Sequence, residues 1–276
     1  MKSVAIIGLG EIGSGVAGAL GRHGGFALAG FDVNGEALRA VEGVVQGRPS
    51  PAQAADGVDV ALIAVMNDGQ TRDVLTGPGG VLTSANPPKA IAILSTVSVE
   101  TILWAADAAA AKGTALVDCG VSGGRQALRE ASITSMVGGS DEAFERVRDV
   151  IAGFSDPVVH CGGLGNGMRA KLARNLIIYT DWMVAWEGTR LALAAGVPLD
   201  KFVQVVTASD RWVRPHMALV EKGTGLTDGD AGRDARTAAY ADKDLQAALA
   251  LGAELGMALP AAELARKRFG SVAGCE

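Results

Sequence analysis

A serine flanked by glycines stands near the middle of the chain and is compatible with two chemistries. The residues Gly120-Val121-Ser122-Gly123-Gly124 fit the pattern G-x-S-x-G. In an α/β-hydrolase this pattern presents a nucleophilic serine on a sharp turn between a strand and a helix. Alternatively, the hydroxyl and the adjacent backbone N–H groups bind a carboxylate, because successive N–H groups form a concave anion site. The rest of the chain must decide between the two.

A glycine-rich segment close to the N-terminus indicates a dinucleotide site. Gly8-Leu9-Gly10-Glu11-Ile12-Gly13 fits G-x-G-x-x-G between an apolar run and a helical pattern, so its N–H groups can face a pyrophosphate. Asp32 ends the next apolar run, nineteen residues after Gly13, where a carboxylate binds the adenosine ribose. Its charge would repel a 2′-phosphate, so the sequence predicts NAD in preference to NADP. The alternative is a tight strand–helix turn in which Asp32 caps the next helix.

A lysine and an asparagine form the third candidate group. Lys171 and Asn175 are four residues apart in a helical pattern, so they share one helix face. A lysine beside an amide at a domain junction can act as an acid/base with a positioning partner. From spacing alone, a solvent-exposed lysine beside an ordinary asparagine is the more common arrangement, because most lysines are exposed.

The elements that must position these residues alternate between strands and helices in the first half of the chain. This alternation predicts an α/β fold with a doubly wound parallel sheet. A helical pattern follows the glycine loop, and another covers residues 99–112. The expected strands are Val4–Gly8, Phe26–Asp32, Val58–Met66, Ala90–Thr96, Thr114–Gly120, 133–139 and 157–163.

The second half is predicted to be helical. No proline interrupts Leu164–Ala195, and one helix over this range would be about 45 Å long at 1.5 Å per residue. Further helical patterns cover 200–207, 211–222, 234–255 and 260–269, and no convincing strand follows His160. We therefore expect a dinucleotide-binding domain over residues 1–163 and an all-helical substrate and dimerisation domain over residues 164–276.

Composition limits the class of protein. The chain has 276 residues, is 49% hydrophobic and carries a net charge of −5, which gives no support for nucleic-acid binding. Its three cysteines and three histidines form no metal-binding motif, and sparse cysteines suit a reducing compartment. The apolar stretch Leu176–Trp186 is interrupted by Asp181 and is too short to span a membrane. We expect a soluble cytoplasmic protein without a metal.

The hydrolase interpretation of Ser122 lacks its context. It requires a helix directly after the serine, with an acid and then a histidine later in the chain. Asp181 or Asp210 followed by His216 has that order. However, the β-type run beginning at Ile133 leaves little room for a helix, and a hydrolase has no use for the glycine loop. Ser122 is therefore interpreted as an anion-binding residue.

Taken together, the motifs resemble those of the β-hydroxyacid dehydrogenases, the family of 3-hydroxyisobutyrate dehydrogenase. The resemblance covers nearly the whole chain, with the motifs in the family's order. They are "GLGEIGSGVAGAL" for the cofactor loop, "STVS" beside the nicotinamide, "DCGVSGG" for the substrate, "GNGMRAKLARN" for catalysis and "KDLQAALALGAELGMALP" near the C-terminus. The resemblance implies a Rossmann domain joined by a long interdomain helix to the helical domain, and a homodimer or homotetramer.

The resemblance also implies roles for individual residues. Lys171 would be the acid/base and Asn175 its partner, while Ser122, Gly123 and Gly124 would bind the carboxylate of a small-molecule substrate. The cofactor would contact the glycine loop, Asp32, Val65, Met66, Asn67, Thr96 and Lys243. The implied reaction interconverts a small 3-hydroxy acid with its semialdehyde or keto acid. Departures from the family pattern include Gly120 in place of proline, Arg174 in place of an asparagine, and Ala131 in place of a glycine.

Two alternatives share the same cofactor loop. Imine reductases have this two-domain plan, but they usually lack a lysine at the position of Lys171. A catalytically inactive, nucleotide-sensing regulator would also use a Rossmann loop. The complete set of Thr96, Ser122, Lys171 and Asn175 favours an enzyme over a regulator.

Overall fold

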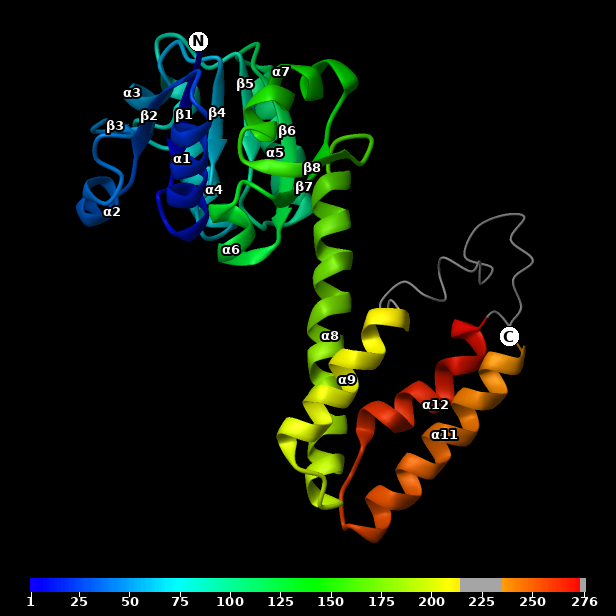
Figure 1. Ribbon diagram of the computed structural model, residues 1–276. Helices are drawn as coiled ribbons and strands as arrows, with labels where there is room; N and C mark the ends of the chain where they lie inside the picture. The colour runs from blue at the N-terminus through cyan, green and yellow to red at the C-terminus, as the bar shows by residue number, and fades with distance from the viewer. Residues whose placement is uncertain (214–234, 274–276) are drawn as a thin grey trace. The chain divides into compact units, whose positions relative to one another are not determined.

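The computed structural model describes residues 1–213 and 235–273 (Figure 1). Contacts divide the chain into two compact units, Met1–Arg174 and Asn175–Glu276, with the division inside one long helix. The domain boundary expected after residue 163 stays a prediction.

The first unit is built on one eight-stranded sheet with the order β3-β2-β1-β4-β5-β6-β7-β8. All neighbouring strands are parallel except β6 and β7, so the predicted doubly wound parallel sheet is confirmed with one antiparallel pair. Only residues 123–132 join β6 to β7, and a parallel crossover needs a dozen or more residues. The strands are β1 Lys2–Ile7, β2 Phe26–Phe31, β3 Gln46–Gly47, β4 Val60–Ile63, β5 Ala90–Ile93, β6 Ala115–Ser122, β7 Ile133–Gly138 and β8 Ser155–His160.

Helices cover both faces of this sheet (Figure 1). Buried residues of α1, α6 and α7 join one core cluster, and those of α3, α4, α5 and the start of α8 join the other. Asparagine or serine caps begin several of these helices, as the orphan N–H groups of a first turn require. The helices are α1 Glu11–His23, α2 Gly35–Arg39, α3 Pro51–Ala55, α4 Asp68–Thr76, α5 Val99–Ala110, α6 Gly124–Arg129 and α7 Asp141–Ala152, with a 3₁₀ turn at Val81–Thr83.

The strand order reverses direction between β1 and β4. From β1 the chain builds outward to β2 and β3, then returns to place β4 on the other side of β1. In an open α/β sheet, ligands bind outside the carboxyl ends of the strands at such a switch point. The fold therefore directs a cofactor to the loops that follow β1 and β4.

The described part of the second unit is helical. The long helix α8, Asn166–Ala194, continues into it from the first unit, followed by α9 Leu199–Val213, α11 Ala235–Glu254 and α12 Pro260–Val272. The patterns expected at 200–207 and from residue 211 onward merge in α9, and residues 214–222 lie outside the described part. The buried carboxylate of Glu187 accepts the N–H groups of Ala261 and Ala262, which fixes α12 against α8. No helix among the described residues is long and apolar enough to cross a membrane.

Candidate active site

The glycine loop turns sharply from β1 into α1. Gly8 has φ +90°, and a Cβ atom there would lie 2.5 Å from the carbonyl oxygen of Ala64, so only glycine fits against the end of β4. Gly13 packs onto the carbonyl of Gly8 in the same way. In contrast, a Cβ at Gly10 would meet nothing within 4 Å, so this side of the loop is open. Bare N–H groups at a helix N-terminus with open space beside them suit a pyrophosphate.

A cavity of about 710 Å³ opens beside this loop. Residues at the carboxyl ends of β1, β2 and β4 line it, including Glu11 and Asp32 of the predicted cofactor site. Asp73 adds a third carboxylate, and the lining contains no lysine, arginine or histidine among the described residues. The full lining is Ile7, Gly8, Gly10, Glu11, Ile12, Phe31, Asp32, Val33, Ala64, Val65, Met66, Gln70, Asp73 and Val74. The space and the loop together fit a dinucleotide.

Asp32 lies one residue after β2 and contacts the glycine loop directly. Its Oδ2 accepts the N–H of Leu9 at 2.6 Å, and its Oδ1 accepts the N–H of Asn34 at 2.7 Å. Asn34, not Asp32, caps α2, so the alternative helix-cap role for Asp32 is wrong. The carboxylate therefore orders the loop as well as adding charge to the cavity.

Two loops that follow β4 and β5 are joined by a carboxylate for which the sequence predicted no role. Asp68 Oδ1 accepts the N–H and the hydroxyl of Ser98 at 3.0 and 2.6 Å. Hydrogen bonds from Ser98 and Thr101 lower the pKa of Asp68 to about 2. Asn67, predicted to contact the cofactor, caps α4 with its side chain. Thr96, predicted to lie beside the nicotinamide, is exposed and stands two residues before Ser98.

The residues after Ser122 form a short helix that the sequence did not predict. The sequence predicts too little room for a helix here, and this is wrong, because α6 begins at Gly124. The helix has only six residues, and the left-handed backbone falls on Gly123 and Gly124 (φ +144° and +76°), not on Ser122. His216, the histidine that a hydrolase would need, lies outside the described residues. Ser122 ends β6 with its side chain half-buried.

The structure brings Lys171 to this same turn. Its Nζ donates to the carbonyl of Val121 at 2.5 Å, one residue before Ser122. Burial lowers the pKa of Lys171, and the positive charge of Arg174 lowers it further. Arg174, which stands where the family pattern has an asparagine, therefore helps to lower the pKa of the candidate base. A half-buried amine with a lowered pKa can accept and donate a proton near neutral pH more readily than an exposed lysine.

The start of α8 is held against the sheet by a buried carboxylate. Asp118, in the middle of β6, is fully buried and accepts the N–H groups of Gly165 and Met168 at 2.6 and 2.5 Å. Burial raises the pKa of this carboxyl, although both hydrogen bonds oppose the rise. Reasoning from the sequence missed this role. Asp118 is the first residue of the "DCGVSGG" motif, so a signal was present.

Glycines on both sides allow this close approach. A Cβ at Gly120 would lie 2.5 Å from Cβ of Lys171, and one at Gly138 would lie 2.7 Å from the N–H nitrogen of Gly167. Gly167 itself packs onto the carbonyl of Met136. Helix α8 therefore packs directly against the backbone of β6 and β7. This contact determines how far Lys171 lies from the Ser122–Gly124 turn.

Two predicted site residues belong to the second unit. Asn175 is half-buried, one helical turn along α8 from Lys171. Lys243 lies on α11 with its side chain 72% exposed, 3.3 Å from a carboxylate oxygen of Asp244 and 5.8 Å from the ring centre of Tyr240. Their roles stay predictions.

Comparison with known proteins places these features in a class. Residues 3–163 match the NAD-binding domain of 6-phosphogluconate dehydrogenase, and residues 165–275 match the NAD-binding domain of NADP-dependent 3-hydroxyisobutyrate dehydrogenase. An uncharacterized oxidoreductase of Mycobacterium tuberculosis is 34% identical over 97% of this chain and 92% of its own length. The 2-(hydroxymethyl)glutarate dehydrogenase of Eubacterium barkeri is 31% identical over 97% of this chain and 89% of its own.

Solved structures agree on the fold. An oxidoreductase from Mycobacterium avium has a TM-score of 0.87 and 30% identity, covering 100% of this chain and 99% of its own. An imine reductase from Bacillus cereus, with a TM-score of 0.77 over 98% of this chain and 92% of its own, is only 16% identical and shares the fold alone.

The fold and the glycine-loop cavity define a Rossmann-type oxidoreductase that uses a nicotinamide cofactor. Within that class, the chain belongs to the β-hydroxyacid dehydrogenase family and is an NAD(P)-dependent hydroxyacid oxidoreductase.

Proposed function

We propose that the protein interconverts a small 3-hydroxy acid and its semialdehyde or keto acid, with NAD as the preferred cofactor. The observation that carries this proposal is the position of Lys171. Its Nζ lies 2.5 Å from the Val121 carbonyl, beside the glycine turn at Ser122–Gly124, and burial lowers its pKa. Proton transfer and carboxylate binding would thus occur within a few residues of each other.

The preference for NAD follows from the charge of the cofactor cavity. Asp32 and Asp73 line it with carboxylates, the Glu11 carboxylate there is paired with Arg125 from outside the cavity, and no basic side chain among the described residues lines it. A 2′-phosphate would enter a negatively charged cavity without a cation to pair with it. The glycine loop and Asp32 would hold the adenosine and pyrophosphate, and the bound nicotinamide supplies the hydride acceptor or donor.

Lys171 would carry the proton. Neutral Lys171 removes the hydroxyl proton when the acid is oxidised, and protonated Lys171 returns it when the carbonyl is reduced. Asn175, on the same face of α8, would help to hold the substrate and the amine. A solvent-exposed lysine would be protonated near neutral pH, so partial burial is a requirement of this role.

The Ser122–Gly124 turn would bind the carboxylate. The Ser122 hydroxyl and the N–H groups of two glycines are the donors available there. Holding the carboxylate fixes which carbon is presented for hydride transfer, and such orientation contributes much of the rate.

A substrate panel tests the proposal. Purified enzyme would be assayed by NADH absorbance with 3-hydroxypropionate, 3-hydroxyisobutyrate and 2-(hydroxymethyl)glutarate. The methyl esters of the first two serve as matched controls, because they keep the alcohol and lose the carboxylate charge. We expect turnover of at least one acid and little turnover of its ester. Esters oxidised as well as the acids, or no acid oxidised at all, would contradict the proposed function.

Replacing Asp32 with serine tests the cofactor preference. We expect the wild type to prefer NAD, and Asp32→Ser to lose much of that preference because the charge that repels a 2′-phosphate is gone. The affinity for NAD should also fall, since Asp32 orders the loop through Leu9. Initial rates against NAD and NADP concentration measure both. Asp73→Asn, which removes another charge from the same cavity, should alter the preference less. A wild type that uses NADP as well as NAD would refute the role of Asp32.

A further inference from the structure

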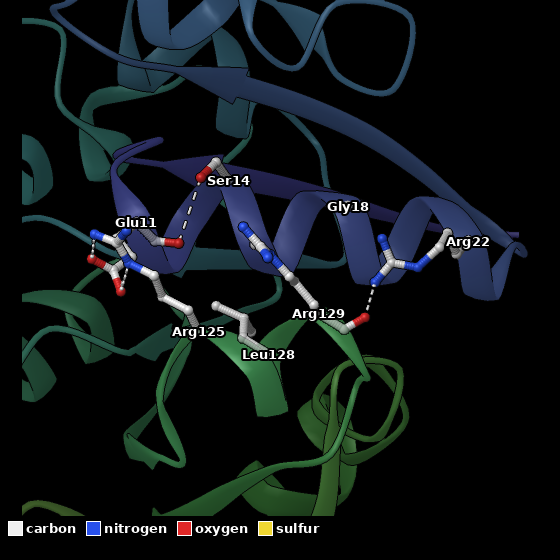
Figure 2. Close-up of a pocket in the computed structure, with 8 residues that line it drawn as sticks. Glu11, Ser14, Gly18, Arg22, Arg125, Leu128 and Arg129 are labelled. Atoms are coloured by element: carbon white, nitrogen blue, oxygen red, sulfur yellow. Dashed lines mark hydrogen bonds and ion pairs between the residues drawn. The ribbon is translucent and has the colours of Figure 1, made fainter.

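A second cavity, of about 550 Å³, lies on the outer side of the cofactor helix α1, between α1 and α6 (Figure 2). Three arginines and one glutamate line it, so it carries a net positive charge. The lining residues are Glu11, Ser14, Gly15, Gly18, Arg22, Arg125, Leu128 and Arg129. Glu11 also lines the cofactor cavity, so its carboxylate lies between the two.

Arg125 and Glu11 form a two-pronged ion pair. The guanidinium Nε lies 2.7 Å from Oε1 of Glu11, and Nη2 donates to Oε2 at 2.8 Å. Bidentate pairs of this kind combine strength with a fixed geometry. The hydrogen bond from Arg125 lowers the pKa of the Glu11 carboxyl, so the pair stays ionised at neutral pH. Glu11 is the first residue of α1, and Arg125 comes directly after Gly124.

Two more contacts fix α6 along α1. The Leu128 side chain fills the notch left by Gly15, where a Cβ atom would collide with it. Arg22 donates from Nη2 to the carbonyl oxygen of Arg129 at 2.7 Å. Figure 2 marks this hydrogen bond with a dashed line. The short helix that continues from the Ser122–Gly124 turn is therefore attached to the helix that begins at the glycine loop.

The Glu11–Arg125 ion pair joins the glycine loop at the start of α1 to the Ser122–Gly124 turn. A pyrophosphate at the N-terminus of α1 would lie near the carboxylate of Glu11, and two anions repel each other. Arg125 neutralises that carboxylate from the outer side. Because Arg125 adjoins Gly124, the same bond fixes the end of the glycine turn relative to the cofactor loop.

We propose that Arg125 is a positioning residue whose ion pair with Glu11 couples cofactor binding at the glycine loop to the conformation of the Ser122–Gly124 turn and α6. The consequence for the substrate rests on the proposed carboxylate-binding role of that turn. The coupling itself requires only the cofactor and the chain.

Four variants of the full-length protein test the coupling with NADH as the probe: Arg125→Ala, Glu11→Gln, the double variant, and Arg129→Ala. Arg129 is the matched control, because it is an arginine of the same helix and the same cavity, and within the described part its contact is with Arg22 through the backbone carbonyl. Two quantities are measured for each: the dissociation constant of NADH by titration calorimetry, and the NADH-induced change in hydrogen exchange over residues 126–129 of α6.

For Arg125→Ala we expect NADH binding to weaken about three- to fivefold, near the upper end of what an exposed ion pair contributes, because Glu11 is left unpaired. The double variant should regain most of the affinity, since the neutral amide introduced by Glu11→Gln no longer repels the pyrophosphate. The NADH-induced protection of α6 should be lost in both, because the physical link is absent from both. Arg129→Ala should match the wild type in both measurements.

Equal protection of α6 in the wild type and Arg125→Ala overturns the proposal. So does an NADH affinity in Arg125→Ala within twofold of the wild type, or an Arg129→Ala variant with the same defects. None of these readouts needs a substrate. If the coupling holds while no 3-hydroxy acid is oxidised, the proposed function fails and the coupling stands.

Discussion

Among single residues, Lys171 shows most clearly how surroundings alter chemistry. A free lysine has a pKa of about 10.4 and is almost fully protonated at neutral pH. Burial against β6 and the nearby charge of Arg174 lower the pKa of Lys171, which raises the fraction of neutral amine. Oxidation needs the neutral amine, so its rate should rise as pH increases through this pKa. Reduction needs the protonated amine, so its rate should fall over the same range.

Lys171→Ala should lower kcat by about 10² to 10⁴, the typical contribution of a positioned acid/base, and should leave NADH affinity close to that of the wild type. Lys171→Arg should restore little activity, because a guanidinium does not release its proton near neutral pH. Profiles of kcat against pH for the wild type and both variants provide the measurement. Lys112→Ala, which removes an exposed lysine after α5, is the control. If Lys171→Ala keeps the acid limb of the oxidation profile, another group moves the proton.

At the scale of elements, the packing of α8 against β6 and β7 positions Lys171. Asp118 accepts two N–H groups at the start of the helix, which satisfies donors that a helix N-terminus leaves unpaired. Glycines at 120, 138 and 167 remove the side chains that would separate helix and sheet. Lys171 lies just over one turn into this helix, so its position depends on the contact.

Gly120→Ala tests the dependence. The added Cβ would lie 2.5 Å from Cβ of Lys171 and 3.2 Å from the carbonyl of Gly167, so helix and strand must separate. We expect the free energy of unfolding to fall by about 1–3 kcal/mol, the usual cost of overpacking, and kcat to fall by more than this instability explains. Gly163→Ala is the control, because a Cβ there meets nothing within 4 Å. Denaturant titration and kcat are measured for both variants. Full activity in Gly120→Ala would show that this packing does not position Lys171.

At the scale of the whole molecule, the described part of the helical unit exposes many large apolar side chains. On α8 these exposed apolar side chains are interspersed with charged residues, and exposed apolar patches mark protein–protein contacts. Leu176 is 70% exposed and Trp186 60% exposed, although Arg190 lies 4.8 Å from the centre of the Trp186 ring. The side chains of Trp182 and Trp212 lie outside the described part. We propose that a second copy of this chain covers the apolar faces, giving a homodimer or homotetramer.

Light scattering coupled to size-exclusion chromatography tests the assembly. We expect the wild type at twice or four times the mass of the chain. Val184→Glu, which places a charge on an exposed apolar position of α8, should shift it toward the monomer. Leu103→Glu introduces the same charge at an exposed apolar position of α5 in the first unit and should not. A monomeric wild type would contradict the proposal.

The sequence was sufficient for the elements and motifs whose signals are local. The glycine loop, the continuous apolar run of β4 and the proline-free α8 each lie within one stretch of chain, and the structure contains all three. Short elements were less predictable. Helix α6 was not expected, because its six residues are too few for a hydrophobic period to show. The antiparallel direction of β7 was missed, because the direction of a strand depends on the length of the connection before it and not on the composition of the strand.

Only the tertiary structure decided how distant residues act on one another. Asp118 and Met168 are fifty residues apart, and Glu11 and Arg125 are 114 apart, so no periodicity links either pair. Arg125 forms an ion pair with the cofactor helix, a contact that no local pattern around Arg125 indicates. The residue types that can bind a dinucleotide, hold a carboxylate or carry a proton were set by the sequence. Their pKa values and partners were set by burial and close packing, which exist only once the sheet has brought the segments together.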